Sequence, residues 1–276
     1  MADEKRKSAV KFGDAPDIKF IFPRDSGAIL LAEKYRLADK SEVFRKLFGS
    51  SSGGQEHGEQ ISITDISYEM FRIMIRHIYN KVVEISEQNF LEILYASRKY
   101  FVETLTYMVI KFVMKFINEE NLAKYFESID KFQIKMLNDH MKKVCKASPL
   151  TIIKSLTCSE AHKRILEIIL ESSDLPCSEF ELYSAIVKML KSERGNGILS
   201  NEDLQKKLGK LVYLIRFPTM SIKELILCGK KPSLLTSQQI VDLLLWVQEN
   251  TYSNSLQFFS NVPRKSSNKS SPKDRC

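Results

Sequence analysis

The feature that most constrains this chain is a change in hydrophobic periodicity along its length. Residues 17–22 alternate apolar and polar side chains, whereas from Ser67 onward apolar residues recur almost everywhere at helical spacing. The longest such series advances in steps of 3, 4, 3 and 4 and comprises Val102, Leu105, Val109, Phe112 and Phe116. We therefore expect a small sheet near the start of the chain and amphipathic helices over the remainder.

The first part of the chain predicts a hairpin, a helix and a further strand. Residues 17–22 and 28–32 form the hairpin around turn residues 23–27, and residues 61–63 form a short strand. Residues 41–48 place four apolar side chains on one helical face, with Ser41 as the N-cap. Four helix pairs are predicted after residue 118. Pro218 ends the last of these pairs, Ser221 caps the helix that follows, and one more helix comes after it. These pairs lie across 119–145, 148–171, 178–193 and 201–216, and the final helix spans 237–248.

Composition indicates a soluble globular protein that is mostly helical. Of 276 residues, 43% are hydrophobic and 28% are charged, and ten glycines and eight prolines are too few for a turn-rich all-β fold. The apolar runs are too short to span a membrane, and the first residues lack a secretory signal. Five widely spaced cysteines then predict reduced thiols and a location in the cytoplasm or nucleus.

The net charge of +8 is a weak argument for nucleic-acid binding. Residues 264–276 hold five basic residues against Asp274, so half of the excess lies in this terminal segment. The other half is spread over the rest of the chain without the dense basic stripe that phosphate binding requires. We therefore expect neither nucleic acid nor membrane as a partner.

The chemistry-bearing residues do not form a catalytic or metal-binding pattern. Phosphate-binding glycine loops, a nucleophile elbow and a His-Glu-x-x-His motif are all absent from the sequence. The four histidines and five cysteines are scattered, which disfavours a metal site. We therefore expect no catalytic residue, cofactor or metal, and no enzyme.

Four motifs in order resemble the BTB/POZ domain. They begin at Ala32-Glu-Lys-Tyr-Arg-Leu-Ala-Asp-Lys-Ser-Glu-Val-Phe44 and continue with Ile61 to Phe71, Ile78 to Ile85 and Ala96-Ser-Arg-Lys-Tyr100. Residues 211–221, which contain Ile-Arg-Phe-Pro-Thr-Met-Ser, are similar to a BACK domain. Residues 256–265 are similar to the linker that precedes the PHR domain of the BTB–BACK–PHR subfamily, although the PHR domain itself is absent from this sequence.

The resemblance implies an α+β BTB/POZ domain followed by an all-α BACK domain. The expected boundaries are a flexible N-terminus over 1–16, the BTB/POZ domain over 17–116, the BACK domain over 117–250 and a disordered, basic, serine-rich tail over 251–276. Phosphorylation is expected in that tail at Ser271 or within residues 264–267.

The resemblance further implies a homodimer with a charged pocket at its interface. Asp17 and Lys34 match the acidic and basic positions of that pocket, and Leu30, Leu31 and Leu37 are either interface residues beside it or ordinary core. The family histidine between the alanine and the basic residue is Glu33 here.

Many BTB–BACK proteins connect a cullin scaffold to a protein substrate for ubiquitination. The resemblance implies the same function for this chain, with a substrate that is unknown. The matching residues are Glu56 in the loop after the first helix, Tyr79, and Phe126 in the helix pair 119–145. The loop carries Gly54 where cullin-binding relatives place an apolar anchor. The alternative is a non-ligase module that dimerises, either with itself or with full-length relatives, and binds cullin weakly or not at all.

Overall fold

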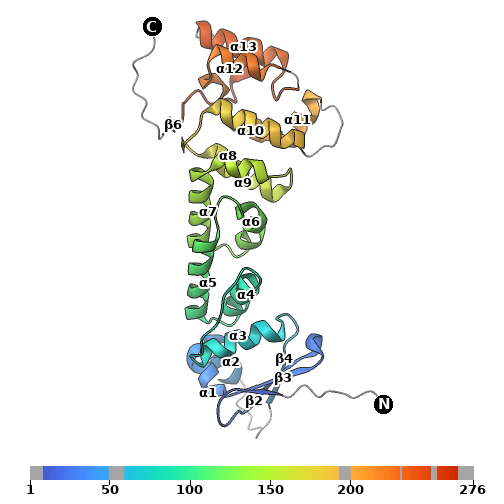
Figure 1. Ribbon diagram of the computed structural model, residues 1–276, viewed down its shortest axis with the longest axis vertical. Helices are drawn as coiled ribbons and strands as arrows, with labels where there is room; N and C mark the ends of the chain where they lie inside the picture. The colour runs from blue at the N-terminus through green and yellow to red at the C-terminus, as the bar shows by residue number, and fades with distance from the viewer. Residues whose placement is uncertain (1–8, 50–58, 193–199, 231, 250–253, 267–276) are drawn as a thin grey trace, which may run out of the picture. The chain divides into compact units, whose positions relative to one another are not determined.

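A computed structural model describes residues 9–49, 59–192, 200–230, 232–249 and 254–266 (Figure 1). The chain divides into two compact units between Phe116 and Ile117. The first unit contains a four-stranded sheet and helices, and the described part of the second is helical apart from one pair of two-residue strands. The fold is therefore predominantly helical with a small mixed sheet, as the sequence predicts.

The sheet of the first unit has the strand order β1-β3-β2-β4. Strands β2 and β3 are antiparallel with Phe20 opposite Leu30, while β1 pairs parallel with β3 and β4 parallel with β2. The strands are β1 (Val10–Lys11), β2 (Ile18–Phe22), β3 (Ala28–Ala32) and β4 (Glu59–Ser62), with a 3₁₀ turn, η1 (Pro23–Asp25), between β2 and β3. The predicted hairpin is confirmed.

The described residues of the first unit also form five helices: α1 (Lys34–Lys40), α2 (Glu42–Gly49), α3 (Tyr68–Ile78), α4 (Phe90–Lys99) and α5 (Glu103–Phe116). Every second residue of β2 and β3 is buried, which directs one face of the sheet into an aromatic core. The Phe20 ring lies 4.9 Å from that of Phe71 on α3, and Phe44 on α2 stacks on Tyr100 at 4.7 Å.

Ser41 caps α2 as the sequence predicts. Its hydroxyl oxygen accepts a hydrogen bond of 3.1 Å from the backbone N–H of Phe44 and donates to the carbonyl of Tyr100 at the end of α4. One buried serine therefore both starts α2 and joins it to α4.

The prediction of a flexible N-terminus up to residue 16 is wrong for the residues around β1. Val10 pairs with Leu30 at the sheet edge, and Phe12 is 4% exposed with its ring 5.4 Å from that of Tyr79. A short polar segment is ordered here because one strand edge and one aromatic contact hold it, and neither is visible in local composition.

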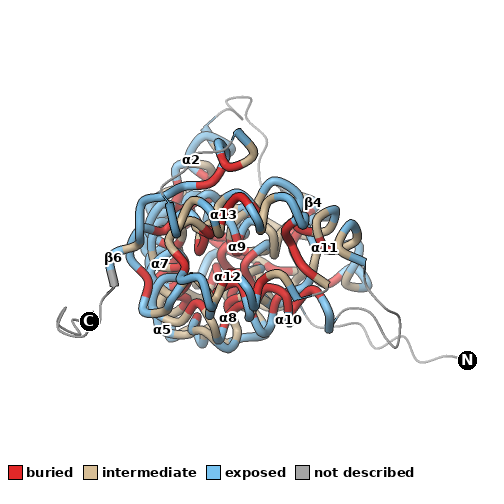
Figure 2. The backbone as a smooth tube through the Cα atoms, turned by 90° about the horizontal axis from the view of Figure 1, so that it is seen from above, coloured by how far each residue is buried: buried red, intermediate tan, exposed pale blue. Residues whose placement is uncertain are grey.

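Helices α6 to α13 make up the described part of the second unit apart from short elements. The predicted helix pairs over 119–145 and 148–171 are confirmed, whereas the pair predicted over 178–193 is a single helix, Glu179–Ser192. Buried and exposed residues alternate along these helices (Figure 2), as expected for amphipathic helices around a core. Their bounds are α6 (Leu122–Asp130), α7 (Lys135–Ala147), α8 (Pro149–Ser155), α9 (Glu160–Glu171), α10 (Glu179–Ser192), α11 (Asn201–Leu208), α12 (Ile222–Cys228) and α13 (Ser237–Glu249).

Short elements connect these helices: η2 (Gly209–Leu214), η3 (Phe217–Thr219), η4 (Asn254–Leu256), β5 (Asp174–Leu175) and β6 (Lys265–Ser266). The helix predicted over 201–216 ends at Leu208 and continues as 3₁₀ turns, because Gly209 has a φ of +59° that an α-helix does not accommodate. Ser221 begins α12 as predicted, and its side chain and that of Glu224 each accept from the other's backbone N–H.

The prediction of a disordered tail over 251–276 is wrong for residues 254–266. Leu256 and Phe259 are 3% and 8% exposed, and Lys265 lies opposite Asp174 in the parallel pair β5–β6. A few buried side chains order this segment although the surrounding residues 251–276 are rich in serine and basic residues. Ser271 lies outside the described residues.

Candidate protein-interaction surfaces

Glu33 is the centre of a hydrogen-bond cluster in the first unit. It precedes α1 and is 4% exposed. One carboxylate oxygen accepts from the backbone N–H groups of Asp14 and Ala15 at 2.9 and 3.2 Å, and the other accepts from Nε of Arg36 at 2.7 Å. The carboxylate therefore joins the segment after β1 to the start of α1.

These contacts stabilise the charged form of Glu33. The backbone N–H of Ala15 contributes most to a pKa below the usual range of a glutamate, and Asp14 and the guanidinium of Arg36 lower it further against the opposing effect of burial. A buried acid is thus kept as an anion that accepts several hydrogen bonds.

Gly13 is required by this cluster. Its φ is +83°, and a β-carbon added there would lie 2.1 Å from Cδ of Glu33. A side chain at position 13 would therefore be strained in its backbone and would overlap the carboxylate. The backbone of Gly13 approaches Glu33 closely enough for the next two N–H groups to reach it.

Tyr79 lies at the C-cap of α3 and its hydroxyl belongs to the same cluster. It accepts from the backbone N–H of Glu33 at 2.8 Å and contacts the carbonyl of Phe12 at 3.4 Å, and burial raises its pKa to about 12. The Arg36 guanidinium lies 5.1 Å from the centre of its ring. The hydroxyl of this predicted cullin-contact residue therefore serves the packing of the first unit.

Asp17 and Lys34, the predicted residues of the dimer pocket, are brought together. Asp17 is exposed, and its carboxylate accepts from the backbone N–H of Lys34 at 2.7 Å. The Lys34 ammonium lies 6.0 Å from the centre of the Phe48 ring. Within one chain, the Asp17 carboxylate thus contacts the backbone of Lys34 at the first turn of α1.

The three leucines considered for the dimer interface differ in exposure. Leu30 and Leu37 have no exposed surface, whereas Leu31 faces the opposite side of β3 and is half-buried. The prediction that Leu30 contributes interface area is therefore corrected: its position in the strand alternation directs it into the aromatic core. Leu31 retains surface that a second copy could cover.

The remaining predicted cullin-contact residues lie elsewhere. Glu56 and Gly54 are outside the described residues. Phe126 on α6 is 3% exposed and belongs to the core of the second unit. Phe126 therefore offers little surface for contact with a cullin, because it shares the inward face of α6 with Leu122 and Ile129.

The described residues contain no group of three or more His, Cys, Asp or Glu side chains placed to hold a metal ion. Burial raises the pKa of the Cys145 thiol to about 12 and that of Cys177 to about 11, which makes both weak nucleophiles. Across the same part of the chain, no helix has the length and apolar character needed to cross a membrane.

Comparison with known proteins places the first unit in a family. Residues 13–116 match the BTB/POZ domain, and this range ends at the boundary between the two units. The first unit is a BTB/POZ domain. Such a domain is a protein–protein interaction module, and the sheet with its covering helices described above is the corresponding fold.

The sequence similarity to known proteins extends beyond the BTB/POZ domain. BTB/POZ domain-containing protein 3 of Homo sapiens is 27% identical over 247 residues, which cover 88% of this chain and 47% of that protein. BTB/POZ domain-containing protein 6 of Xenopus tropicalis is 26% identical over 88% of this chain and 46% of its own length. The chain spans about half the length of these curated relatives. Among solved structures, the BTB domain of zebrafish PATZ1 covers 36% of this chain and 76% of its own, with a TM-score of 0.32 and 18% identity.

Proposed function

We propose that this chain is a protein-interaction scaffold whose BTB/POZ domain joins two copies. The BTB/POZ domain at residues 13–116 is the observation that carries this proposal. We further propose that residues 117–250 of the second unit form a BACK domain, the domain that the Ile-Arg-Phe-Pro-Thr-Met-Ser segment resembles. It presents helices that hold partner proteins at a defined place.

The surface around α1 supports dimerisation. Asp17 is exposed beside the first turn of α1, and Leu31 is half-buried on the strand before it. Tyr35 on α1 and Leu47 on α2 are 65% and 41% exposed. A self-complementary contact between two copies would cover this apolar area and give the exposed carboxylate of Asp17 a cationic partner.

The role we propose for the dimer is that of a substrate adaptor of a cullin-RING ubiquitin ligase, in the cytoplasm or nucleus. The proposal rests on the BTB/POZ domain and its helical continuation. The alternative is a non-ligase dimerising module. Gly54 in place of an apolar anchor, and the engagement of the Tyr79 hydroxyl with Glu33, favour that alternative.

Cullin capture by matched variants separates the two functions. A buried aliphatic anchor contributes about 2 kcal/mol, so Gly54→Leu should tighten cullin binding on the order of 30-fold if this chain is an adaptor. Gly53→Leu is the control, because it adds the same side chain one residue out of register. If neither the natural chain nor Gly54→Leu captures cullin while both are dimers by light scattering, the chain is a non-ligase module. If they are monomers, the scaffold proposal itself is wrong.

A further inference from the structure

Residues 254–266 contact the rest of the second unit through three separated buried side chains, with smaller contacts from Ser255 to Asp242 and from the Phe258 ring to Tyr213. Leu256 and Phe259 are 3% and 8% exposed, and the Arg264 side chain is 4% exposed. Between these anchors the side chains face solvent, and Phe258 and Val262 are each 62% exposed. This pattern of isolated buried side chains along an otherwise exposed backbone is typical of a bound linear peptide.

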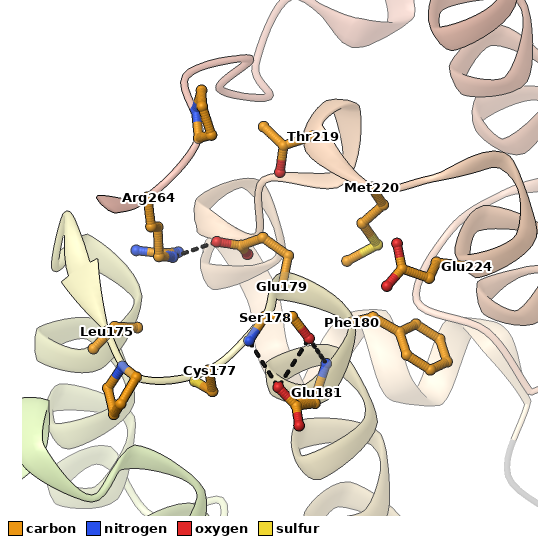
Figure 3. A pocket seen from close by; sticks show the side chains of 12 residues that line it. Leu175, Cys177, Ser178, Glu179, Phe180, Glu181, Thr219, Met220, Glu224 and Arg264 are labelled. Atoms are coloured by element: carbon orange, nitrogen blue, oxygen red, sulfur yellow. Dashed lines mark hydrogen bonds and ion pairs between the residues drawn. The ribbon is translucent and has the colours of Figure 1, made fainter. Parts of the chain in front are cut away.

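The Arg264 guanidinium occupies a slot made of backbone carbonyls and one carboxylate. It donates to the carbonyls of Leu170 at 2.6 Å and Leu214 at 3.1 Å, and also to that of Ser172. It forms an ion pair with Glu179, which is 8% exposed (Figure 3). The planar guanidinium has five fixed donors, so it satisfies such a set of acceptors where an ammonium cannot.

The other contacts of the segment are of the same peptide-like kind. The Phe259 ring meets that of Phe217 edge-on at 5.4 Å and that of Tyr213 at 5.4 Å. The N–H of Lys265 donates to the carbonyl of Ser173 at 2.7 Å, and β6 adds to β5 as a parallel strand of two residues. Apolar anchors together with strand addition are a common mode of peptide recognition.

The segment does not fill the groove in which it lies. A cavity of about 370 Å³ adjoins the Arg264–Glu179 pair. Its lining includes Cys177, Phe180 and Met220 together with Arg264 (Figure 3). This cavity is open to solvent, so the segment lies against it as at a docked interface and is not enclosed in a core.

We propose that residues 254–266 are a displaceable peptide, and that the second unit carries a groove for the pattern Leu-x-x-Phe-x-x-x-x-Arg that this chain occupies in cis. The same groove accepts an extended peptide with this pattern from another chain when the segment is released. Arginine is the specificity-determining anchor, because the slot offers three carbonyls and a buried carboxylate at fixed positions. This inference does not depend on dimerisation or on cullin binding.

The test supplies the peptide in trans to the full-length chain. The double variant Phe259→Ala/Arg264→Ala removes two anchors from the segment, and Val262→Ala/Lys265→Ala removes two exposed neighbours as the matched control. A fluorescent peptide of residues 254–266 is titrated into both variants and into the natural chain, and anisotropy is measured. A second peptide carries Arg264→Lys.

The proposal requires the anchor variant to bind the natural peptide at least about tenfold more tightly than the lysine peptide. It also requires the natural chain and the control to bind the peptide at least about tenfold more weakly than the anchor variant, since their groove is occupied. Hydrogen exchange of residues 172–176 should rise in the anchor variant and fall again when the peptide is added.

Three results would overturn the proposal. Loss of helical circular dichroism in the anchor variant would show that the segment belongs to the folding core. A folded variant that does not bind the peptide would show that there is no separable groove. Equal binding of the arginine and lysine peptides would remove the guanidinium slot as the source of specificity.

Discussion

At the scale of single residues, the Glu33 cluster shows how one buried carboxylate organises the edge of a domain. The anion accepts from two consecutive backbone N–H groups and from Arg36, and it holds Phe12 and Tyr79 in reach of each other. Gly13 permits this approach because it has no β-carbon. Glu33 departs from the BTB/POZ pattern, in which a histidine occupies this position. In this chain the substituted residue is the centre of a hydrogen-bond cluster of its own.

Gly13→Ala should destabilise the chain more than Gly27→Ala. Both positions have positive φ, so both alanines carry a backbone cost of about 1–2 kcal/mol. Only the new β-carbon at position 13 meets Glu33, whereas position 27 has open space around it. The extra loss should be about 1–3 kcal/mol by urea unfolding and should disappear in a Glu33→Ala background. Equal losses for the two glycines would contradict the close approach.

Glu33→Gln should change how stability depends on pH. The folded-state pKa of Glu33 is lowered, so as the pH falls below about 4.3 the unfolded chain takes up the proton first and the stabilisation is lost. The difference in unfolding free energy between the natural chain and Glu33→Gln should therefore be largest near neutral pH and shrink in acid.

Glu84→Gln is the control for this pH dependence, since Glu84 is an exposed carboxylate in the same domain. Urea titrations of both variants from about pH 3 to 7 measure the effect. A gap for Glu33→Gln that stays constant over this range would show that its carboxylate is not held as an anion by the fold.

At the scale of elements, serine side chains begin helices in both units. Ser41 starts α2 and contacts the end of α4, and Ser200 and Ser221 form reciprocal caps with the third residue of α11 and α12. Such caps satisfy backbone N–H groups that have no partner inside the helix. They set the first residue of each helix, while the apolar faces decide where it packs.

Ser221→Ala should destabilise the second unit by about 1 kcal/mol, because it removes the acceptor for the Glu224 N–H and the first turn of α12 loses its cap. Ser148→Ala is the control, since Ser148 precedes α8 without a side-chain cap bond and should change stability by less than about 0.5 kcal/mol. Thermal unfolding followed by circular dichroism measures both. A similar loss for the two variants would show that the cap on α12 contributes nothing.

At the scale of the whole molecule, the chain combines a BTB/POZ domain with a helical unit whose last residues fold back onto it. The boundary between Phe116 and Ile117 follows the end of the longest amphipathic helix of the first unit. Each unit has its own aromatic or aliphatic core, so each surface can bind a partner without disturbing the other core.

Asp17→Ala/Lys34→Ala should weaken dimerisation at least about tenfold if these residues form a charged pair across the interface. Asp39→Ala/Lys40→Ala is the control, because it removes an exposed ion pair of 2.9 Å from α1, the helix that begins at Lys34. Sedimentation of both variants over a range of concentrations gives the dissociation constants, and melting curves check that the loss of the Asp17 contact with the Lys34 N–H leaves the fold intact. Equal constants for the two variants would place the interface elsewhere.

Much of the fold is determined by local pattern. The alternation in 17–22, the turn residues after it and the apolar run 28–32 predict the hairpin. The 3–4 spacing after Ser67 predicts the helices, and Ser41 and Ser221 mark two helix starts. These features depend on neighbours within a few residues, and side-chain period and capping chemistry act over that range. The aromatic side chains that the pattern directs inward, such as Phe20 and Phe71, do form the core.

Tertiary structure alone decided which polar residues are buried together. Glu33 meets backbone N–H groups nearly twenty positions earlier in the chain, and Arg264 meets Glu179 across more than eighty positions. Composition predicts that charged side chains such as Glu and Arg are exposed to solvent. Leu30 and Leu31 are the same residue type, and only the alternation of side chains along β3 buries Leu30 and leaves Leu31 partly exposed. Whether a charge is solvated or paired depends on groups that only the folded chain brings within hydrogen-bond distance, and this is the reason that the order in residues 10–16 and 254–266 was not predictable from the sequence.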